Sequence, residues 1–244
     1  MYTSKTTIYS MTNILKTWFL SFLHLIYPHQ CAVCGGLLLD GEEGICIKCN
    51  MDMPRTNYHR WKDNPVERMF WGKFPFERAT SYFFYHKGGD FPRIVHLLKY
   101  DGRQDLGDIM GRFMAAELLD SGFFRDVDVI VPVPLHPRKQ QLRGYNQSEC
   151  IARGIISVTG IPLDVSSVIR SKHTDTQTRK SAIERWDNVD GIFRLLHPER
   201  FTGKHILLVD DVLTTGATTT ACADAFKEVE GIRISILTLA VAAS

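Results

Sequence analysis

The sequence lacks several features that would assign it to a simple class. It has no long basic run, and its 29 Lys and Arg residues nearly match 27 Asp and Glu, which gives a net charge of +2. That balance offers no bulk electrostatic argument for binding nucleic acid. We find no internal repeat and no low-complexity stretch, which argues against repeat and low-complexity architectures. With 44% apolar residues, the 244 residues suffice for one large domain, or for a domain with a small module.

The sequence also lacks an apolar run long enough to cross a bilayer. Its most apolar stretch, residues 14–27, is interrupted by Lys16 and His24, whereas a spanning helix needs about 20 apolar residues. No small-residue cleavage site follows, which disfavours a signal peptide. Apolar residues recur there at helical spacing: Leu15, Trp18, Phe19, Phe22, Leu23 and Ile26. We expect an amphipathic helix docked on the chain and a cytoplasmic protein without stable membrane insertion; peripheral contact with the inner membrane is the weaker alternative.

Two Cys-x-x-Cys pairs, Cys31/Cys34 and Cys46/Cys49, follow this stretch. Each pair offers two thiolates to one tetrahedral ion, and the glycine-rich segment between them can form a hairpin, so the spacing predicts a zinc ribbon. Disulfides or a redox motif are the alternatives, and both are less favoured in a reducing compartment. Because four cysteines fill the coordination sphere, we expect the zinc to be structural.

Strand and helix patterns alternate through the rest of the chain. Strands are expected over 79–85, 127–133, 163–169, 206–209 and 233–242, and helices over 94–100, 106–119, 148–156 and 221–229. This order predicts an α/β fold with a parallel sheet and helices on both faces. We divide the chain into a tail and amphipathic helix over 1–27, a ribbon and packed aromatic connector over 28–78, and the α/β domain over 79–244. Lys99 and Arg103 are interpreted as solvated surface charges, and Cys150 and Cys222 as buried inert thiols.

Residues 205–220 carry the most specific pattern in the chain. A short β-branched and Leu run ends at Asp210 and Asp211, and a glycine-centred loop then leads into a helical pattern. The loop consists of Thr214, Thr215, Gly216, Ala217 and Thr218. Free N–H groups at the start of a helix favour a phosphate, whereas carboxylates favour hydroxyl groups or Mg²⁺. A phosphate partner beside a diol partner indicates a phosphorylated pentose.

Basic residues follow the expected strand over 127–133. Arg138, Lys139 and Arg143 come before any acid in this region, and together they predict an anion site; a solvated basic turn is the alternative. A second polar segment, 170–188, includes Arg179 and is long for a connection between a strand and the next element. Such a length is typical of a lid or of disorder, and a lid would exclude water from a reactive centre.

The chain resembles two nested families. The pattern over 205–220 resembles the type I phosphoribosyltransferases, which bind 5-phosphoribosyl 1-pyrophosphate (PRPP) with Mg²⁺. Together with the cysteine pairs, four further stretches resemble the ComF family of bacterial competence proteins, close to the GntX type: Leu98–Gly102, Val131–His136, Arg143–Gln147 and the segment from Gln177 to Asn188.

The resemblance implies roles for the residues named above. Asp210 and Asp211 would take the ribose hydroxyls, the threonine loop the 5'-phosphate, and Arg138, Lys139 or Arg143 the pyrophosphate. The family is associated with uptake of single-stranded DNA in natural transformation, so single-stranded DNA or DNA-uptake proteins are expected partners. We therefore expect transfer of a phosphoribosyl group to an acceptor that the motifs do not identify. A non-catalytic PRPP- or nucleotide-binding accessory for single-stranded DNA is the alternative.

Overall fold

The computed structural model describes residues 29–86, 88–170 and 191–242. It separates two compact units, Met1–Asp52 and Met53–Ser244. The amphipathic helix expected over 14–27 lies outside the described residues, as does almost all of the expected lid, including Arg179. Among the helices of the described part, none is both long and apolar enough to span a membrane.

The described part of the first unit is small and irregular. An antiparallel bridge joins Gln30 to Leu37, and a single short helix, α2 (Ile47–Met51), follows. The Cys46 sulfur accepts a hydrogen bond from the Cys49 amide and so caps the start of α2. Cys31 and Cys34 therefore flank a turn, whereas Cys46 caps α2 and Cys49 lies within it.

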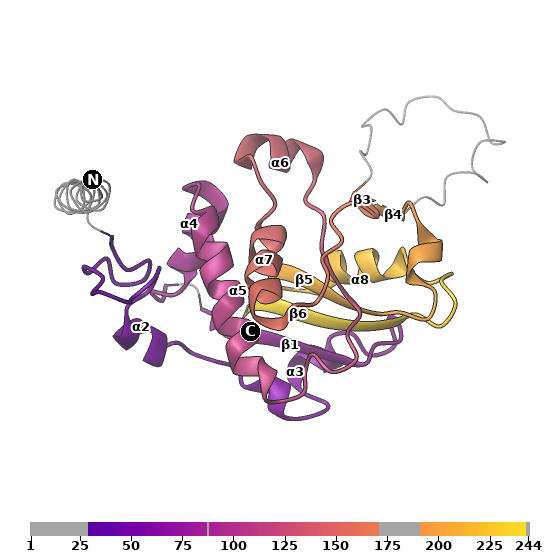
Figure 1. The fold of residues 1–244 in the computed structure, drawn as a ribbon, viewed down its shortest axis with the longest axis horizontal. Helices are drawn as coiled ribbons and strands as arrows, with labels where there is room; N and C mark the ends of the chain where they lie inside the picture. The colour runs from indigo at the N-terminus through magenta and orange to yellow at the C-terminus, as the bar shows by residue number, and fades with distance from the viewer. Residues whose placement is uncertain (1–28, 87, 171–190, 243–244) are drawn as a thin grey trace, which may run out of the picture. The chain divides into compact units, whose positions relative to one another are not determined.

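The second unit is built on a parallel sheet with the strand order β1-β6-β5-β2 (Figure 1). Its strands are β1 (Arg78–Tyr85), β2 (Val129–Pro132), β5 (His205–Leu213) and β6 (Arg233–Ala242). Residues 206–209 of β5 are fully buried, because β5 is a central strand covered on both faces. The predicted parallel α/β fold is confirmed.

Helices cover both faces of this sheet (Figure 1). The helices are α3 (Pro65–Arg68), α4 (Pro92–Tyr100), α5 (Gln104–Leu119), α6 (Pro137–Arg143), α7 (Gln147–Thr159) and α8 (Ala217–Asp224). On one face α5 and α7 approach closely, since a Cβ on Gly154 would lie 2.0 Å from the carbonyl oxygen of Asp108. The opposite face is covered by α3, α8 and a core containing Phe70, Phe201 and Phe226.

The connector packs against the sheet from Met53 onward, as its aromatic composition predicted. It contains two single-turn elements, η1 (Tyr58–Arg60) and α3, and Phe74 and Phe76 pack on the fully buried Phe70. The side chain of Asn64 accepts hydrogen bonds from the amides of Val66 and Glu67 and thereby caps α3. The division of the chain into three parts stays a prediction.

Two predicted elements differ in the structure. The strand expected over 163–169 is reduced to a bridge at Leu163 and a short β3 (Val168–Arg170) that pairs antiparallel with β4 (Phe193–Leu195), which precedes a 3-10 turn, η3 (Pro198–Phe201). The carboxylate of Asp164 accepts hydrogen bonds from the amides of Ser166 and Ser167, and this turn interrupts the strand.

The end of the helix that follows the threonine loop, which was expected to be completed over 221–229, is the second difference. α8 begins at Ala217 and ends at Asp224, and 3-10-type turns follow it. Phe226 and Val229 are nevertheless buried, so the apolar residues that predicted the helix continue into the turns after it.

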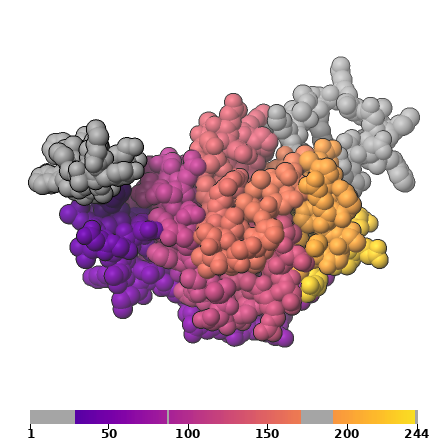
Figure 2. Space-filling model, in the orientation of Figure 1, coloured from indigo at the N-terminus to yellow at the C-terminus, as the bar shows by residue number. Residues whose placement is uncertain are grey.

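The carboxyl edge of the sheet opens between β5 and β2. β2 pairs with β5 up to Val209, whose carbonyl oxygen still accepts a hydrogen bond of 2.9 Å from the amide of Val133, but β6 continues pairing up to Leu213. The chain after β2 forms α6, which lies away from the sheet and projects from the molecular surface (Figures 1 and 2). The residues of β5 after Val209 therefore face this opening without a strand partner on the β2 side.

Candidate functional site

Asp210 and Asp211 lie where β5 loses its β2 neighbour. Both are partly buried, and the Oδ1 atom of Asp210 accepts two hydrogen bonds, each of 2.9 Å, from the hydroxyl of Ser148 and the amide of Asp211. The Oδ1 atom of Asp211 accepts a hydrogen bond of 2.6 Å from the amide of Val212. Each carboxylate is thus held in a fixed orientation by donors from the protein.

The environment of Asp210 disfavours the ionised form of its carboxyl group. Burial and then the neighbouring charge of Asp211 raise the pKa of Asp210 to about 7, although hydrogen bonds from the Asp211 amide and Ser148 and the positive charge of Lys99 oppose that rise. Near neutral pH this carboxyl can therefore either donate or accept a hydrogen bond.

Asp211 forms an ion pair with Lys99. The Nζ atom of Lys99 in α4 lies 3.1 Å from Oδ2 of Asp211, and both side chains are mostly withdrawn from solvent. The interpretation of Lys99 as a solvated surface charge was wrong. The end of α4 is held at this place because the fully buried Leu98 accepts a hydrogen bond of 2.6 Å from the hydroxyl of Tyr145.

The threonine loop joins β5 to α8. Gly216 has a positive φ of 76°, and a Cβ at this position would lie 3.0 Å from the ring of Phe70. Gly216 also stands at the N-cap of α8 without a side-chain cap. Thr214, Thr215, Ala217 and Thr218 are exposed. The loop therefore presents backbone N–H groups and hydroxyls to solvent at the start of a helix, an arrangement that can bind an anion.

Basic side chains lie on α6, which follows β2, and on the connector. Arg138 and Lys139 are exposed on α6. Arg143, at its end, donates a hydrogen bond of 2.7 Å to Gln147 and stacks over the ring of Tyr100. Because Gln147 precedes Ser148, Arg143 is linked through α7 to Asp210. On the connector, Nζ of Lys73 lies 3.4 Å from the carbonyl oxygen of Thr215.

Sequence reasoning missed four residues of this region: Lys73, Lys99, Ser148 and Arg170. The guanidinium of Arg170 stacks over Phe193, and its Nε atom is buried without a hydrogen-bond partner among the described residues. Burial raises the pKa of the Cys222 thiol, the charge of Asp210 raises it further, and the charge of Arg170 lowers it. The available signal for Arg170 was its place as the first residue of the long polar segment, at the end of an expected strand.

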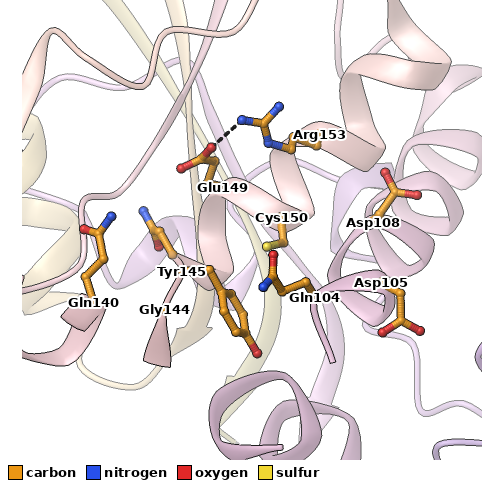
Figure 3. Close-up of a pocket in the computed structure, with 10 residues that line it drawn as sticks. Gln104, Asp105, Asp108, Gln140, Gly144, Tyr145, Glu149, Cys150 and Arg153 are labelled. Atoms are coloured by element: carbon orange, nitrogen blue, oxygen red, sulfur yellow. Dashed lines mark hydrogen bonds and ion pairs between the residues drawn. The ribbon is translucent and has the colours of Figure 1, made fainter. Parts of the chain in front are cut away.

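A pocket of about 540 Å³ lies outside the acid–threonine region, between the starts of α5 and α7 (Figure 3). Its carboxylates are already in ion pairs, including Asp105 with Arg103 and Glu149 with Arg153. Cys150 also lines it, and burial raises the pKa of that thiol to about 11, in agreement with the prediction of an inert thiol. This pocket shares no residue with the threonine loop or the acid pair.

The four cysteines of the first unit form a cluster suited to one metal ion. Their sulfur atoms all lie within 4.8 Å of one another, and Sγ of Cys34 is 3.9 Å from Sγ of Cys46. A tetrahedral ion with metal–sulfur bonds of about 2.3 Å would place the sulfurs roughly 3.8 Å apart. All six cysteines are free thiols. Burial opposes the Cys31 thiolate, but hydrogen bonds from backbone amides lower its pKa to about 6.

The chain is similar to proteins of known families. A model of the phosphoribosyl transferase domain family matches residues 109–244. The chain is 29% identical over 209 residues to "DNA utilization protein YhgH" of Escherichia coli K12, covering 80% of this chain and 88% of that protein. It is 39% identical over 92 residues to "Competence protein F" of Haemophilus influenzae, covering 37% of this chain and 40% of that protein.

A solved structure, the allosteric regulatory enzyme of purine biosynthesis, is also similar. It shares 21% identity and a TM-score of 0.38 over 53% of this chain and 25% of its own. That score is too low to support an inference about this chain. The family match spans more than half of the residues and includes β2, β5, β6 and the acid–threonine region. The chain belongs to the phosphoribosyl transferase domain family, and its relatives place it in the ComF-type family.

Proposed function

We propose that the chain binds PRPP, or a related ribose phosphate, at the carboxyl edge of the sheet. One observation carries this proposal: two oriented carboxylates on β5 are followed at once by an exposed threonine loop at the start of α8. Acceptors for a sugar diol and donors for a phosphate thus lie side by side on one continuous segment. In open α/β sheets this edge is the usual place for ligands.

Each part of the site then has a separate role. Asp210 and Asp211 accept hydrogen bonds from the ribose hydroxyls, and the loop from Thr214 to Thr218 binds the 5'-phosphate. Arg138, Lys139 and Arg143 offset the charge of the pyrophosphate. Mg²⁺ accompanies PRPP and supplies further positive charge at the pyrophosphate. Arg179 was expected to contribute as well, but it lies outside the described residues.

The chemistry supported best is transfer of the phosphoribosyl group. The bond from C1 of the ribose to the pyrophosphate oxygen would break through an oxocarbenium-like state, so the protein's contribution is position and charge. Carboxylates beneath the ribose favour the positive charge that develops there. The acceptor is a nucleophile that takes the place of pyrophosphate at C1.

A second function is supported by the partners that the two carboxylates already have within the protein. Asp211 is engaged by Lys99 and Asp210 by Ser148, so neither is a free general base for an acceptor. The two relatives are named for DNA utilization and for competence. Both observations favour a non-catalytic PRPP- or nucleotide-binding accessory for single-stranded DNA or DNA-uptake proteins.

We further infer that the metal of the first unit is zinc. Four thiolates in a tetrahedral arrangement suit Zn²⁺, and they leave no open position for substrate. The zinc would hold the two cysteine turns together and have a structural role. Its binding would contribute folding free energy to a unit whose described residues, 29–52, include few buried apolar side chains.

One experiment separates the two functions. The zinc-loaded protein is incubated with PRPP and Mg²⁺, and pyrophosphate release is measured with and without pools of nucleobases, amines and single-stranded DNA. Acceptor-dependent release supports the transferase. Binding of PRPP without such release, together with retention of single-stranded DNA, supports the accessory function.

A further inference from the structure

The ion pair between Lys99 and Asp211 is a fixed part of the acid site. The exposed fractions of the two side chains are 22% and 14%, and the atoms in contact lie 3.1 Å apart. Lys99 stands in the last turn of α4, and the neighbouring Leu98 is fully buried and bonded to the Tyr145 hydroxyl. The lysine backbone is thus anchored by the core, which distinguishes this contact from a mobile surface pair.

Two adjacent carboxylates repel each other unless positive charge or donors offset them. In this structure the protein supplies both. Lys99 neutralises Asp211, and the hydroxyl of Ser148 and the amide of Asp211 donate to Asp210. A divalent cation bound to this pair would have to displace the ammonium group and would compete with these donors. A sugar hydroxyl needs only a free lone pair on a carboxylate oxygen.

We propose that Lys99 is a positioning residue that takes the place of a divalent cation at the acid pair. Its ammonium group holds Asp211 ready for a ribose hydroxyl and keeps metal ions off both carboxylates. The proposal rests on the proposed ribose-phosphate function of the site. It implies that a ribose phosphate without pyrophosphate binds without metal, and that Mg²⁺ enters the site with the pyrophosphate and not through the carboxylates.

The first test uses ribose 5-phosphate, which lacks pyrophosphate, titrated calorimetrically in EDTA and then in Mg²⁺. The native protein should bind it with the same affinity in both conditions, to within about twofold. Lys99→Met should weaken binding in EDTA by about 10-fold or more, the size of a lost charged interaction, and Mg²⁺ should restore most of it. Lys99→Arg should retain binding in EDTA. Loss that Mg²⁺ does not restore would assign Lys99 a merely structural role.

Lys204 provides a matched control. It also pairs with an aspartate, Asp128, at 3.7 Å, but it stands at the opposite end of β5. Lys204→Met should leave ribose 5-phosphate affinity unchanged with or without Mg²⁺. An equal effect from Lys204→Met would overturn the specific role of Lys99.

A second measurement does not depend on the sugar. Free Mn²⁺ is followed by electron paramagnetic resonance during titration of zinc-loaded protein. The native chain should not retain Mn²⁺ at the acid pair, Lys99→Met should gain one site, and adding Asp211→Asn should abolish it. Equal Mn²⁺ binding by the native chain would overturn the proposal. If no variant binds ribose 5-phosphate but the Mn²⁺ difference appears, the proposed function fails while the role of Lys99 stands.

Discussion

The four-cysteine cluster and the acid–threonine site are assembled in opposite ways. The cluster takes all its ligand atoms from one short stretch, Cys31 to Cys49, in a unit with one short helix among its described residues. The acid–threonine site gathers Lys99 from α4, Ser148 from α7 and the acid pair from β5 around a buried parallel sheet. We infer that the first site needs its ligand to be folded, whereas the second is ordered by the core before any ligand binds.

This difference separates the effects of mutation. Loss of a metal ligand should remove structure, since metal binding and folding are one equilibrium in such a unit. Loss of a side chain at the acid–threonine site should remove affinity and leave the sheet intact, because the core stands without it. Variants of the two regions should therefore differ in whether they lose structure or affinity.

The largest effect is expected from Cys34→Ser. Structural zinc contributes an apparent ~10–16 kcal/mol in zinc-finger peptides, so this variant should lose its metal and the ordered turns over residues 29–52. Elemental analysis and limited proteolysis check both results, and the part from Met53 onward should resist cleavage. Cys150→Ser is the control and should keep one zinc per chain. Less than half an equivalent of zinc in the native protein, with thiols oxidised in pairs, would contradict the zinc assignment.

Gly216→Ala should affect both fold and binding. A non-glycine residue in the left-handed region costs about 1–2 kcal/mol, and the added methyl group would meet Phe70 at 3.0 Å and displace the loop. We expect a lower urea midpoint and at least ~10-fold weaker binding of ribose 5-phosphate, equivalent to about 1.4 kcal/mol. Gly160 also has a positive φ, but no atom lies near its missing Cβ. Gly160→Ala should therefore share the loss of stability and keep the affinity.

Asp211→Asn should weaken PRPP binding about 10- to 100-fold without changing the fold. The variant removes a charged acceptor for the ribose, worth roughly 1.5–3 kcal/mol, and it also removes the partner of Lys99. Calorimetry measures the affinity, and circular dichroism checks the fold. Asp128→Asn removes the acid that faces Lys204 at the other end of β5 and should leave binding unchanged. Equal weakening by both variants would remove the acid pair from the site.

The pH dependence of binding should report on Asp210. Its pKa is raised to about 7, so it becomes a charged acceptor only above that pH, and ribose 5-phosphate affinity should rise up to about 10-fold from pH 6 to 8. The folded state holds this proton more tightly than the unfolded chain, so this group's contribution to stability falls as pH rises through 7. Asp210→Asn should remove the contribution of this carboxyl to the pH dependence of affinity and to the pH dependence of stability. The ligand phosphate has a second pKa of about 6 and therefore also titrates in this range. Its effect is the same for the native protein and for Asp210→Asn, so it drops out of the difference between them.

Arg138→Ala should have the smallest effect. The residue is exposed on α6, where a single ion pair contributes at most about 1 kcal/mol. Ribose 5-phosphate affinity should be unchanged and PRPP affinity slightly lower. If the chain is a transferase, pyrophosphate release should fall more than binding does. Arg200→Ala, at an exposed position of η3, is the control.

The sequence predicted the contiguous parts of both sites. The cysteine pairs, the acid pair and the threonine loop each lie within one short motif, and the buried run over 206–209 indicated a central strand. It did not predict Ser148, because this residue and Asp210 are 62 positions apart and meet through the packing of α7 on the sheet. Lys99 was missed because its partner Asp211 is also distant in the sequence. A lysine near a turn is, moreover, usually a surface charge. The strand over 163–169 was overpredicted because the Asp164 turn competes locally with the apolar pattern.

The most direct test of the ribose-phosphate site is a calorimetric titration of zinc-loaded protein with PRPP and Mg²⁺. The native chain is compared with a double variant, Asp210→Asn and Asp211→Asn, that keeps its zinc. We expect one PRPP bound per native chain and no detectable binding to the variant, with equal zinc content in the two proteins. Absence of PRPP binding by the native chain, or equal binding by the variant, would contradict it.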